Sequence, residues 1–321
     1  MIRRALNDPS LENALSVMTP DGATYFTVAP PGSPAALRGI ILHGTRAIVQ
    51  LRVNHDLGPI ETLLLGKACL CAGLMAAVLK DTGAVSMRID GDGPADGLSA
   101  EGRRSESGTI SVRGRLFLNP IPFTVPPETL ESASLFGRGS LTITRFANDA
   151  GRPFSGTVSL GTDGIAKNLV RYFLESEQTK TALDAGIQFD REGRPRGAGA
   201  LFLQALPGAD PEFIAAVEDA MSGLPPLGLW FAEGGTRTEF VRSLYGKFGA
   251  LVVGESGFRF DCPCSKERFG SYLAALDSKS LHGLAETGPW PVETVCHQCN
   301  SVYRFEREEI VAMLPESEGR S

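Results

Sequence analysis

The sequence contains no long hydrophobic segment and no recognisable targeting signal. Its most apolar stretch, Ala68–Leu79, has only twelve residues, whereas an α-helix needs about 20 to cross a bilayer. The two arginines near the start are followed by Asp8 and Glu12 before any apolar run, which is unlike a signal or transit peptide. We therefore expect a cytoplasmic protein that has no membrane partner.

The sequence is also poor in features that identify nucleic-acid-binding proteins and common enzymes. Its formal net charge is −6, so it has no basic excess to attract a polyanion. It has four histidines and none of the motifs G-x-S-x-G, H-E-x-x-H or G-x-x-x-x-G-K-[ST], which mark serine hydrolases, zinc proteases and P-loop proteins. We expect no nucleic-acid partner and no enzymatic activity; an enzyme with an unrecognised site in the N-terminal part is a minor alternative.

Cysteine is scarce, but its distribution is informative. Four of the six cysteines fall within 38 residues, as the pairs Cys262/Cys264 in F-D-C-P-C-S and Cys296/Cys299 in V-C-H-Q-C-N. Cytoplasmic thiols stay reduced, so clustered cysteines indicate a metal or redox site rather than structural disulfides. Two tight pairs separated by a few dozen residues can supply four thiolates in a tetrahedral arrangement, which suits Zn²⁺. We predict one zinc ion per chain, held by these four residues.

Other interpretations of the histidines and cysteines were weighed. His297 lies inside the second turn, but with four thiolates available we expect it to be exposed. A thioredoxin-type dithiol belongs at the start of a helix, whereas V-Y-R-F after Cys299 favours a strand. A nucleic-acid-binding zinc ribbon should be basic, yet residues 249–321 carry seven lysines and arginines against eleven aspartates and glutamates. Cys69 and Cys71 lie on different faces of an apolar helix, where we expect buried thiols without an assigned role.

Hydrophobic periodicity predicts an α+β fold for the N-terminal two-thirds of the chain, most simply an antiparallel sheet with helices. Alternation of apolar and polar residues predicts strands within 85–89, 109–114, 140–146, 155–160, 186–190 and 200–206. Helical spacing predicts helices at 60–80 and 164–178. The type of the segments 24–29 and 44–53 is ambiguous.

The sequence after residue 206 predicts a linker followed by a small domain. We divide the sequence into an α+β core domain (1–206), an amphipathic helical linker (207–247) and a C-terminal zinc-binding domain (248–321). Helices are predicted from Pro211, at 238–246, over 266–286 and at 308–314, with a strand at 302–305. The linker residues that we expect to respond to clients are Phe213, Val217, Leu227, Trp230 and Phe231.

A site made of four thiolates can serve either as a structural staple or as a switch. Oxidation of thiolates to disulfides removes the metal ligands. Structural zinc contributes about 10–16 kcal/mol to the folding of zinc-finger-type modules, whereas a whole domain is typically stable by about 5–15 kcal/mol. A C-terminal domain that loses its metal should therefore unfold and loosen the linker, which exposes apolar surface that can bind other apolar surface.

Motifs spread along almost the entire chain resemble those of one known family. They are Asn54-His55-Asp56, A-V-L-K at 77–80, G-D-G-P at 91–94, Y-F-L-E-S-E-Q at 172–178, G-A-L-F-L-Q-A-L-P-G at 199–208, C-P-C-S-K-E-R at 262–268 and C-H-Q-C-N-S-V-Y-R-F at 296–305. The combination of C-x-C-S-x-x-R with a distal C-x-x-C is highly specific. On these residues the sequence resembles the heat-shock protein 33 family of bacterial redox-regulated chaperones.

The resemblance implies a holdase chaperone that works without ATP and is idle while its four cysteines hold zinc. Hypochlorous acid, or peroxide with heat, is expected to form the disulfide Cys296–Cys299 and then Cys262–Cys264, with zinc release and unfolding of the C-terminal domain and linker. The activated form, favoured as a homodimer, would hold unfolding client proteins and later pass them to ATP-dependent foldase chaperones. An unregulated zinc-stapled binding or adaptor protein is the alternative function.

Overall fold

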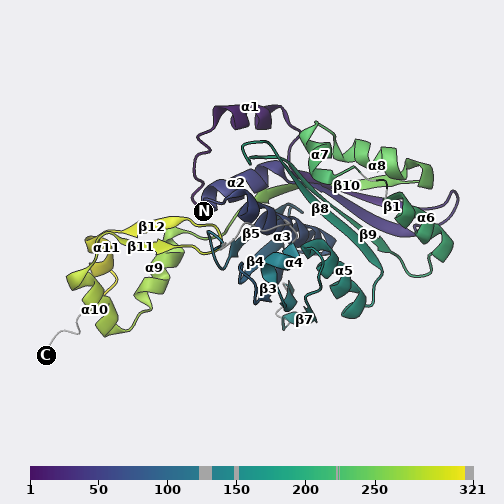
Figure 1. Cartoon of the computed structure of the whole chain (residues 1–321). Coiled ribbons are helices and arrows are strands. Elements are labelled where there is room, and N and C mark those ends of the chain that lie inside the picture. Colours follow the sequence, from purple (N-terminus) through teal and green to yellow (C-terminus); the bar gives the residue numbers. More distant parts are fainter. Residues whose placement is uncertain (123–131, 148–151, 222, 224, 315–321) are drawn as a thin grey trace.

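The computed structural model describes residues 1–122, 132–147, 152–221, 223 and 225–314, and its largest element is a ten-stranded sheet (Figure 1). The strands lie in the order β7-β6-β3-β4-β5-β10-β1-β2-β9-β8. Their bounds are β1 Gly22–Val28, β2 Leu37–His43, β3 Gly83–Gly91, β4 Gly97–Arg104, β5 Ile110–Leu116, β6 Gly139–Ala147, β7 Phe154–Ser159, β8 Thr181–Phe189, β9 Pro195–Ala205 and β10 Leu251–Phe260. The pair β10–β5 is parallel, and the other neighbouring pairs are antiparallel. This sheet and the helices packed on it confirm the predicted α+β class.

The helices of the main body and the linker surround this sheet. They are α1 Pro9–Val17, α2 Thr45–His55, α3 Pro59–Val78, α4 Ser132–Phe136, α5 Ile165–Glu175, α6 Pro211–Met221, α7 Leu227–Ala232 and α8 Arg237–Tyr245. The long helix α3 packs against both halves of the sheet, on β3, β4 and β5 and on β8 and β9. Its apolar residues form the centre of the largest hydrophobic core.

Helix α3 confirms the helix predicted at 60–80 and contains most of the twelve-residue apolar stretch. In the described part of the chain, α3 is the helix whose length of 20 residues and apolar composition would be sufficient to cross a membrane. The mean hydropathy of its most apolar window is 1.6. However, 83% of the most apolar 18-residue window is buried inside the protein, between the sheet and its covering helices. The length of α3 is therefore explained by its position in the core.

The two ambiguous segments fold differently from each other. Residues 24–28 of the first segment belong to strand β1, whereas residues 45–53 of the second fall within helix α2. The helical prediction over 266–286 is confirmed in type, but residues 275–277 divide this stretch into two helices, α9 Lys266–Ala274 and α10 Ser278–Thr287. The side chain of Asp277 accepts a hydrogen bond from the backbone N–H of Ser280 and so caps the second helix.

The linker helices α6, α7 and α8 lie over one end of the sheet (Figure 1) and share a second hydrophobic core with it. Val217, Leu227 and Phe231 are fully buried there, while Phe213 and Trp230 are half-buried at its margin. The apolar faces expected of this segment are therefore covered by the sheet in this state.

Helix α7 approaches the sheet so closely that only glycine fits at several contact positions. A Cβ atom on Gly228 would lie 2.4 Å from the backbone N of Gln188 in β8. On the facing strand β9, a Cβ on Gly197 would lie 2.0 Å from the carbonyl oxygen of Gly228, and one on Gly199 would lie 2.2 Å from the ring of Phe231. The helix consequently docks backbone to backbone, and any added side chain here must push it away.

His43 at the end of β2 stacks on Phe231 of the linker, with ring centroids 4.4 Å apart. Burial, with a smaller effect of the nearby guanidinium groups of Arg237 and Arg46, lowers the pKa of His43 from 6.5 to about 3. The unfolded chain therefore binds a proton here between about pH 3 and 6.5 that the folded chain does not bind, so stability falls as the pH is lowered through this range. When the pH is lowered from 6.5 to 5, we expect the unfavourable protonation of His43 to reduce the unfolding free energy of the wild type by about 2 kcal/mol. Denaturant unfolding at both pH values should show a smaller loss for His43→Gln; equal losses in both proteins would contradict this.

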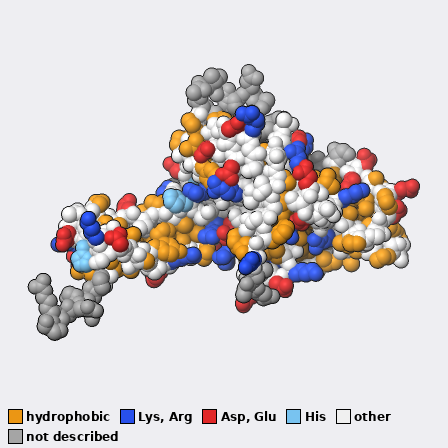
Figure 2. All heavy atoms as spheres, turned by 90° about the horizontal axis from the view of Figure 1, so that it is seen from below, with side chains coloured by type: hydrophobic (Ala, Val, Ile, Leu, Met, Phe, Trp, Pro, Cys, Tyr) orange, Lys and Arg blue, Asp and Glu red, His pale blue; other side chains and the backbone are white. Residues whose placement is uncertain are grey.

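The C-terminal part of the chain leaves the sheet and forms a small lobe. Beyond β10 the lobe contains α9, α10, the two-stranded sheet β11 Val292–Val295 and β12 Val302–Phe305, and α11 Arg307–Val311. It projects from the main body as a narrow extension (Figures 1 and 2). The predicted division at 206 and 247 stays a prediction, but β10, which it assigns to the C-terminal domain, is hydrogen-bonded into the large sheet.

Candidate metal centre

The four clustered cysteines lie at the junction between the lobe and the main body. Cys262 and Cys264 follow directly after β10, and Cys296 and Cys299 lie in the turn that joins β11 to β12. This turn is held by its own backbone, since the N–H of Cys296 donates to the carbonyl of Ser301 (2.9 Å) and the N–H groups of Cys299 and Asn300 donate to the carbonyl of Cys296. The two cysteine turns come from segments that meet only because the lobe folds back on the end of β10.

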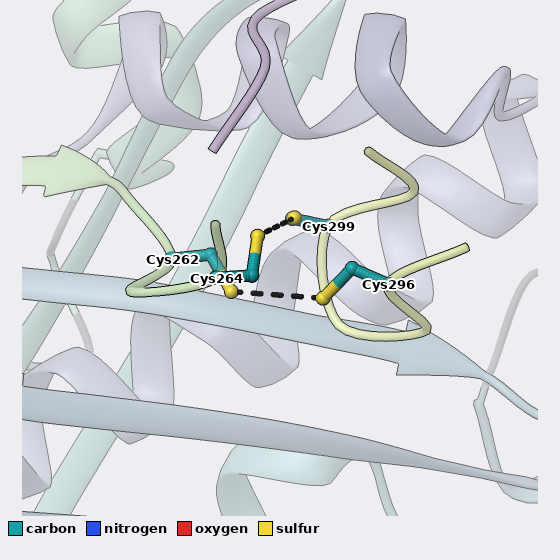
Figure 3. Close-up of side chains that lie close together, drawn as sticks. All are labelled: Cys262, Cys264, Cys296 and Cys299. Carbon is teal, nitrogen blue, oxygen red and sulfur yellow. Dashed lines mark hydrogen bonds between the residues drawn. The ribbon is translucent and has the colours of Figure 1, made fainter. Parts of the chain in front are cut away.

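The four sulfur atoms point toward one another (Figure 3) and all lie within 4.8 Å of each other. The Sγ atoms of Cys264 and Cys299 are 3.3 Å apart, and those of Cys262 and Cys296 are 3.8 Å apart. All four side chains are buried. A tetrahedral Zn²⁺ site with metal–sulfur bonds of about 2.3 Å requires sulfurs roughly 3.8 Å apart. The donor set and its spacing therefore fit a metal ion of this kind.

Side chains outside the quartet contact three of its sulfurs, and one of these contacts is between the hydroxyl of Ser301 and Cys299 Sγ, 3.2 Å apart. The Nη1 atom of Arg113, on β5, donates to Cys262 Sγ at 3.3 Å, and the same guanidinium is held by two hydrogen bonds to Glu101 on β4. In the lobe, the hydroxyl of Tyr303 lies 3.2 Å from Cys264 Sγ and donates to the backbone carbonyl of Cys264 at 3.0 Å. A cation from the sheet thus faces a sulfur that carries negative charge when it binds a metal.

Hydrogen bonds among the cysteines shift the pKa values of their thiols in opposite directions. Hydrogen bonds from the thiols of Cys296 and Cys299, with a further one from Arg113, lower the pKa of Cys262. The same hydrogen bonds to Cys262 raise the pKa values of Cys296 and Cys299. The thiolate, which is the form that binds metals and reacts with oxidants, is therefore favoured at Cys262 over Cys296 and Cys299.

The C-terminal end of helix α2 holds the second cysteine turn against the main body. Asn54 is fully buried, and its Nδ2 donates to the carbonyls of both Cys299 and Ile2 at 2.9 Å. In return, Nδ2 of Asn300 donates to the carbonyl of Asn54 at 2.9 Å. The Asn-His-Asp motif at 54–56, which had no assigned role, therefore connects the core helices to the cysteine turn.

We predict that Asn54→Ala loosens this connection. The substitution removes the Asn54 donor from the buried carbonyl of Cys299, at a cost of about 1–3 kcal/mol, whereas the carbonyl of Ile2 still accepts a hydrogen bond from the hydroxyl of Ser301. Zinc-loaded protein should then transfer its metal to a colorimetric chelator at least about tenfold faster than the wild type. His297→Ala is the matched control, because His297 lies in the same turn but is exposed. Equal transfer rates in Asn54→Ala and wild type would show that the lobe holds the metal independently of the core.

The remaining predictions about cysteine and histidine side chains can be checked directly. His297 is exposed, as expected. Cys69 and Cys71 are fully buried in α3, as expected, and burial raises the pKa of both thiols, to about 12 for Cys71. Both thiols therefore stay protonated near neutral pH. The contacts made by Arg113 and Tyr303 were not foreseen, because nothing in the spacing of the sequence connects either residue to the cysteines.

Comparisons with known proteins agree on one family. A family model described as "Hsp33 protein" matches residues 33–306. A protein named "33 kDa chaperonin" from Citrifermentans bemidjiense is 30% identical over 302 residues, covering 92% of this chain and all of the relative. Another of that name from Shouchella clausii is 29% identical and covers 92% of this chain and 99% of the relative. The crystal structure of the 33 kDa chaperonin (heat shock protein 33 homolog) from Thermotoga maritima has the same fold, with a TM-score of 0.77 at 24% identity over 91% of this chain and 97% of that one.

Proposed function

This chain belongs to the Hsp33 family, and on that premise we propose that it is a redox-regulated holdase chaperone that needs no ATP. The observation that carries the proposal is the buried group of four sulfurs within 4.8 Å, assembled from two turns at the base of a small lobe. We propose Cys262, Cys264, Cys296 and Cys299 as the ligands of one Zn²⁺ ion in the reduced protein. When bound, the ion would supply the cross-link between the two turns.

The lobe has little else to hold it folded. Helix α9 buries only Gly270 among its residues, α10 buries Leu281 and Ala285, and α11 buries Ile310. A module this thin rarely reaches independent stability without a metal or disulfides. We therefore propose that the lobe unfolds when its sulfurs no longer coordinate a metal.

Oxidation would remove the ligands in pairs. Two thiolates lose one electron each and form a disulfide bond, while a two-electron oxidant such as hydrogen peroxide takes up two protons and leaves as two molecules of water. We propose the pairs Cys262–Cys264 and Cys296–Cys299. Each of these disulfides joins two residues of the same turn, so neither replaces the link between the turns, and the lobe is free to open.

Opening of the lobe would release the linker, because β10 connects the two. The apolar faces now covered by the sheet would then become available to unfolding client proteins. We propose that Phe213, Val217, Leu227, Trp230 and Phe231 belong to this responsive surface. We also propose that the protein acts in the cytoplasm, that the activated form is a homodimer, and that clients pass to ATP-dependent foldase chaperones after reduction.

The test compares the reduced and the peroxide-treated protein in one assay. Light scattering from a heat-denatured client should be suppressed by the oxidised protein and hardly at all by the reduced protein. Zinc release and loss of helical circular dichroism should accompany this gain. Equal suppression in both states would instead favour an unregulated zinc-stapled adaptor, and zinc loss from a lobe that stays folded would refute the proposed switch.

A further inference from the structure

Strand β10 occupies the centre of the large sheet and bridges its two halves. Residues 251–257 pair with β1, in a ladder interrupted at Val253, which has no partner in β1. Leu251 and Val253 remain 65% and 58% exposed. The last three residues, Phe258 to Phe260, pair with β5, and both phenylalanines are buried. The strand therefore contacts β1 and β5 with different parts of its length, and its exposed, interrupted beginning is the part most easily frayed.

That end fits a preformed slot for aromatic side chains. The ring of Phe258 lies so close to Gly44 and Gly73 that a Cβ atom on either glycine would approach it to 2.7 or 2.6 Å. Leu70 also borders this slot, 3.0 Å from a Cβ built on Gly44. Two positions further along, the ring of Phe260 packs edge-on against His55, with centroids 6.4 Å apart. The body of the protein therefore presents two apolar subsites spaced for alternate residues of an extended chain.

The anchored end is also the part of β10 nearest to the cysteines. The backbone N–H of Asp261 donates to the carbonyl of Val112 in β5 at 3.0 Å, and Cys262 follows immediately. Arg113, the next residue of β5, donates to the sulfur of Cys262. When the lobe unfolds, the contacts made by residues 261 and 262 are lost, and β10 is held only by the interrupted ladder with β1 and the three-residue pairing with β5.

We propose that β10 is an internal competitor for the client-binding site. Once the lobe unfolds, β10 leaves the sheet, and an extended segment of an unfolding protein takes its place between β1 and β5. The backbone groups of both strands recognise any extended chain, and the two apolar subsites select segments with aromatic or large apolar residues at alternate positions. Arg237, which lies 3.9 Å from Glu255 of β10, favours an acidic or neutral residue nearby. This inference rests on the proposed function and specifies how clients bind.

Hydrogen–deuterium exchange on the full-length protein tests the exit of β10. The amides of residues 22–27 in β1 and 110–112 in β5 that point toward β10, rather than toward β2 or β4, should be protected in the reduced protein, exposed after oxidation, and protected again when a client is bound. Strand β3, which pairs with β4 and β6 and has no contact with β10 in the order of the sheet, is the internal control and should stay protected throughout. Unchanged protection of β1 and β5 in an oxidised protein that suppresses client aggregation would overturn the inference while leaving the proposed function intact.

A labelled peptide with the sequence of residues 251–261, L-V-V-G-E-S-G-F-R-F-D, tests occupancy of the slot. It should bind the oxidised protein, measured by fluorescence anisotropy, should not bind the reduced protein, and should compete with a client. The matched F258S/F260S peptide should bind at least about tenfold more weakly, because it cannot fill the apolar subsites. Equal binding of the two peptides, or absence of competition, would overturn the inference. Absence of any gain in chaperone activity on oxidation would overturn the proposed function and this inference with it.

Discussion

A Cys264→Ser chain is expected to purify without zinc and to suppress client aggregation even in full reductant. Its sulfur is one of four that a tetrahedral metal needs, and a serine hydroxyl is a poor replacement for a thiolate. Structural zinc contributes about 10–16 kcal/mol to such modules, which is more than the thin core of this lobe can replace. Metal analysis should give close to one zinc ion per wild-type chain and almost none for the variant. Light scattering in the presence of reductant should show activity near that of the oxidised wild type.

The control for this experiment removes a thiol that lies outside the quartet. Cys71→Ala deletes a sulfur that is buried in α3. Its zinc content should therefore equal that of the wild type, and the reduced variant should remain inactive as a chaperone. If Cys264→Ser loses its metal while the lobe remains compact by limited proteolysis, metal loss does not open the lobe. The proposed switch would then be wrong, whatever the activity of the variant.

A Gly228→Val chain is expected to be active while its zinc site is intact. The added side chain collides with the backbone of β8, since a Cβ at this position lies 2.4 Å from the N atom of Gln188. Backbone cannot move aside as a flexible side chain can, so α7 must leave the sheet. Overpacking of a tight contact costs about 1–3 kcal/mol or more, which shifts the balance between docked and undocked α7 by about tenfold to more than a hundredfold. Suppression of client aggregation by the reduced, zinc-loaded variant measures this shift.

The matched control for Gly228→Val lies in the same linker. Gly246 has a right-handed backbone (φ −56°), and a Cβ there would lie 4.0 Å from Arg242 Cγ, an ordinary van der Waals contact. Gly246→Ala should therefore leave the reduced protein idle. An idle Gly228→Val protein in which α7 exchanges its amides freely would show that exposure of this helix is insufficient to bind clients.

The candidate site could be located from the sequence because its chemistry is local. Two pairs of cysteines within short turns need little more than their spacing to be recognised. The residues around them could not be found this way: Arg113 comes from β5 and Asn54 from α2, and both reach the cysteines only through the tertiary fold. The Asn-His-Asp motif was noticed as part of the family resemblance, but its contact with the carbonyl of Cys299 depends on that same fold.

The fold was predictable where a strand shows its buried face in its own sequence. In β3 the alternation around Val85, Met87 and Ile89 corresponds to buried positions. Strand β10 has no such pattern, because Leu251 to Val253 are exposed and two glycines follow. Its assignment to the sheet depends on β1, so neither composition nor periodicity within residues 251–260 could reveal it. Helix α2 was ambiguous for a related reason, since it is buried on more than one face.

The position of β10 also affects how quickly the molecule can return to its idle state. Thr24 and Glu255, which meet across the β1–β10 pair, are 231 positions apart in the chain. The strand can leave the sheet by fraying from its exposed beginning, whereas re-entry has to restore the ladder with β1 and the pairing with β5 together. The protein should therefore become active quickly and become inactive slowly. After a brief oxidative pulse, its chaperone activity should persist for some time once reducing conditions have returned.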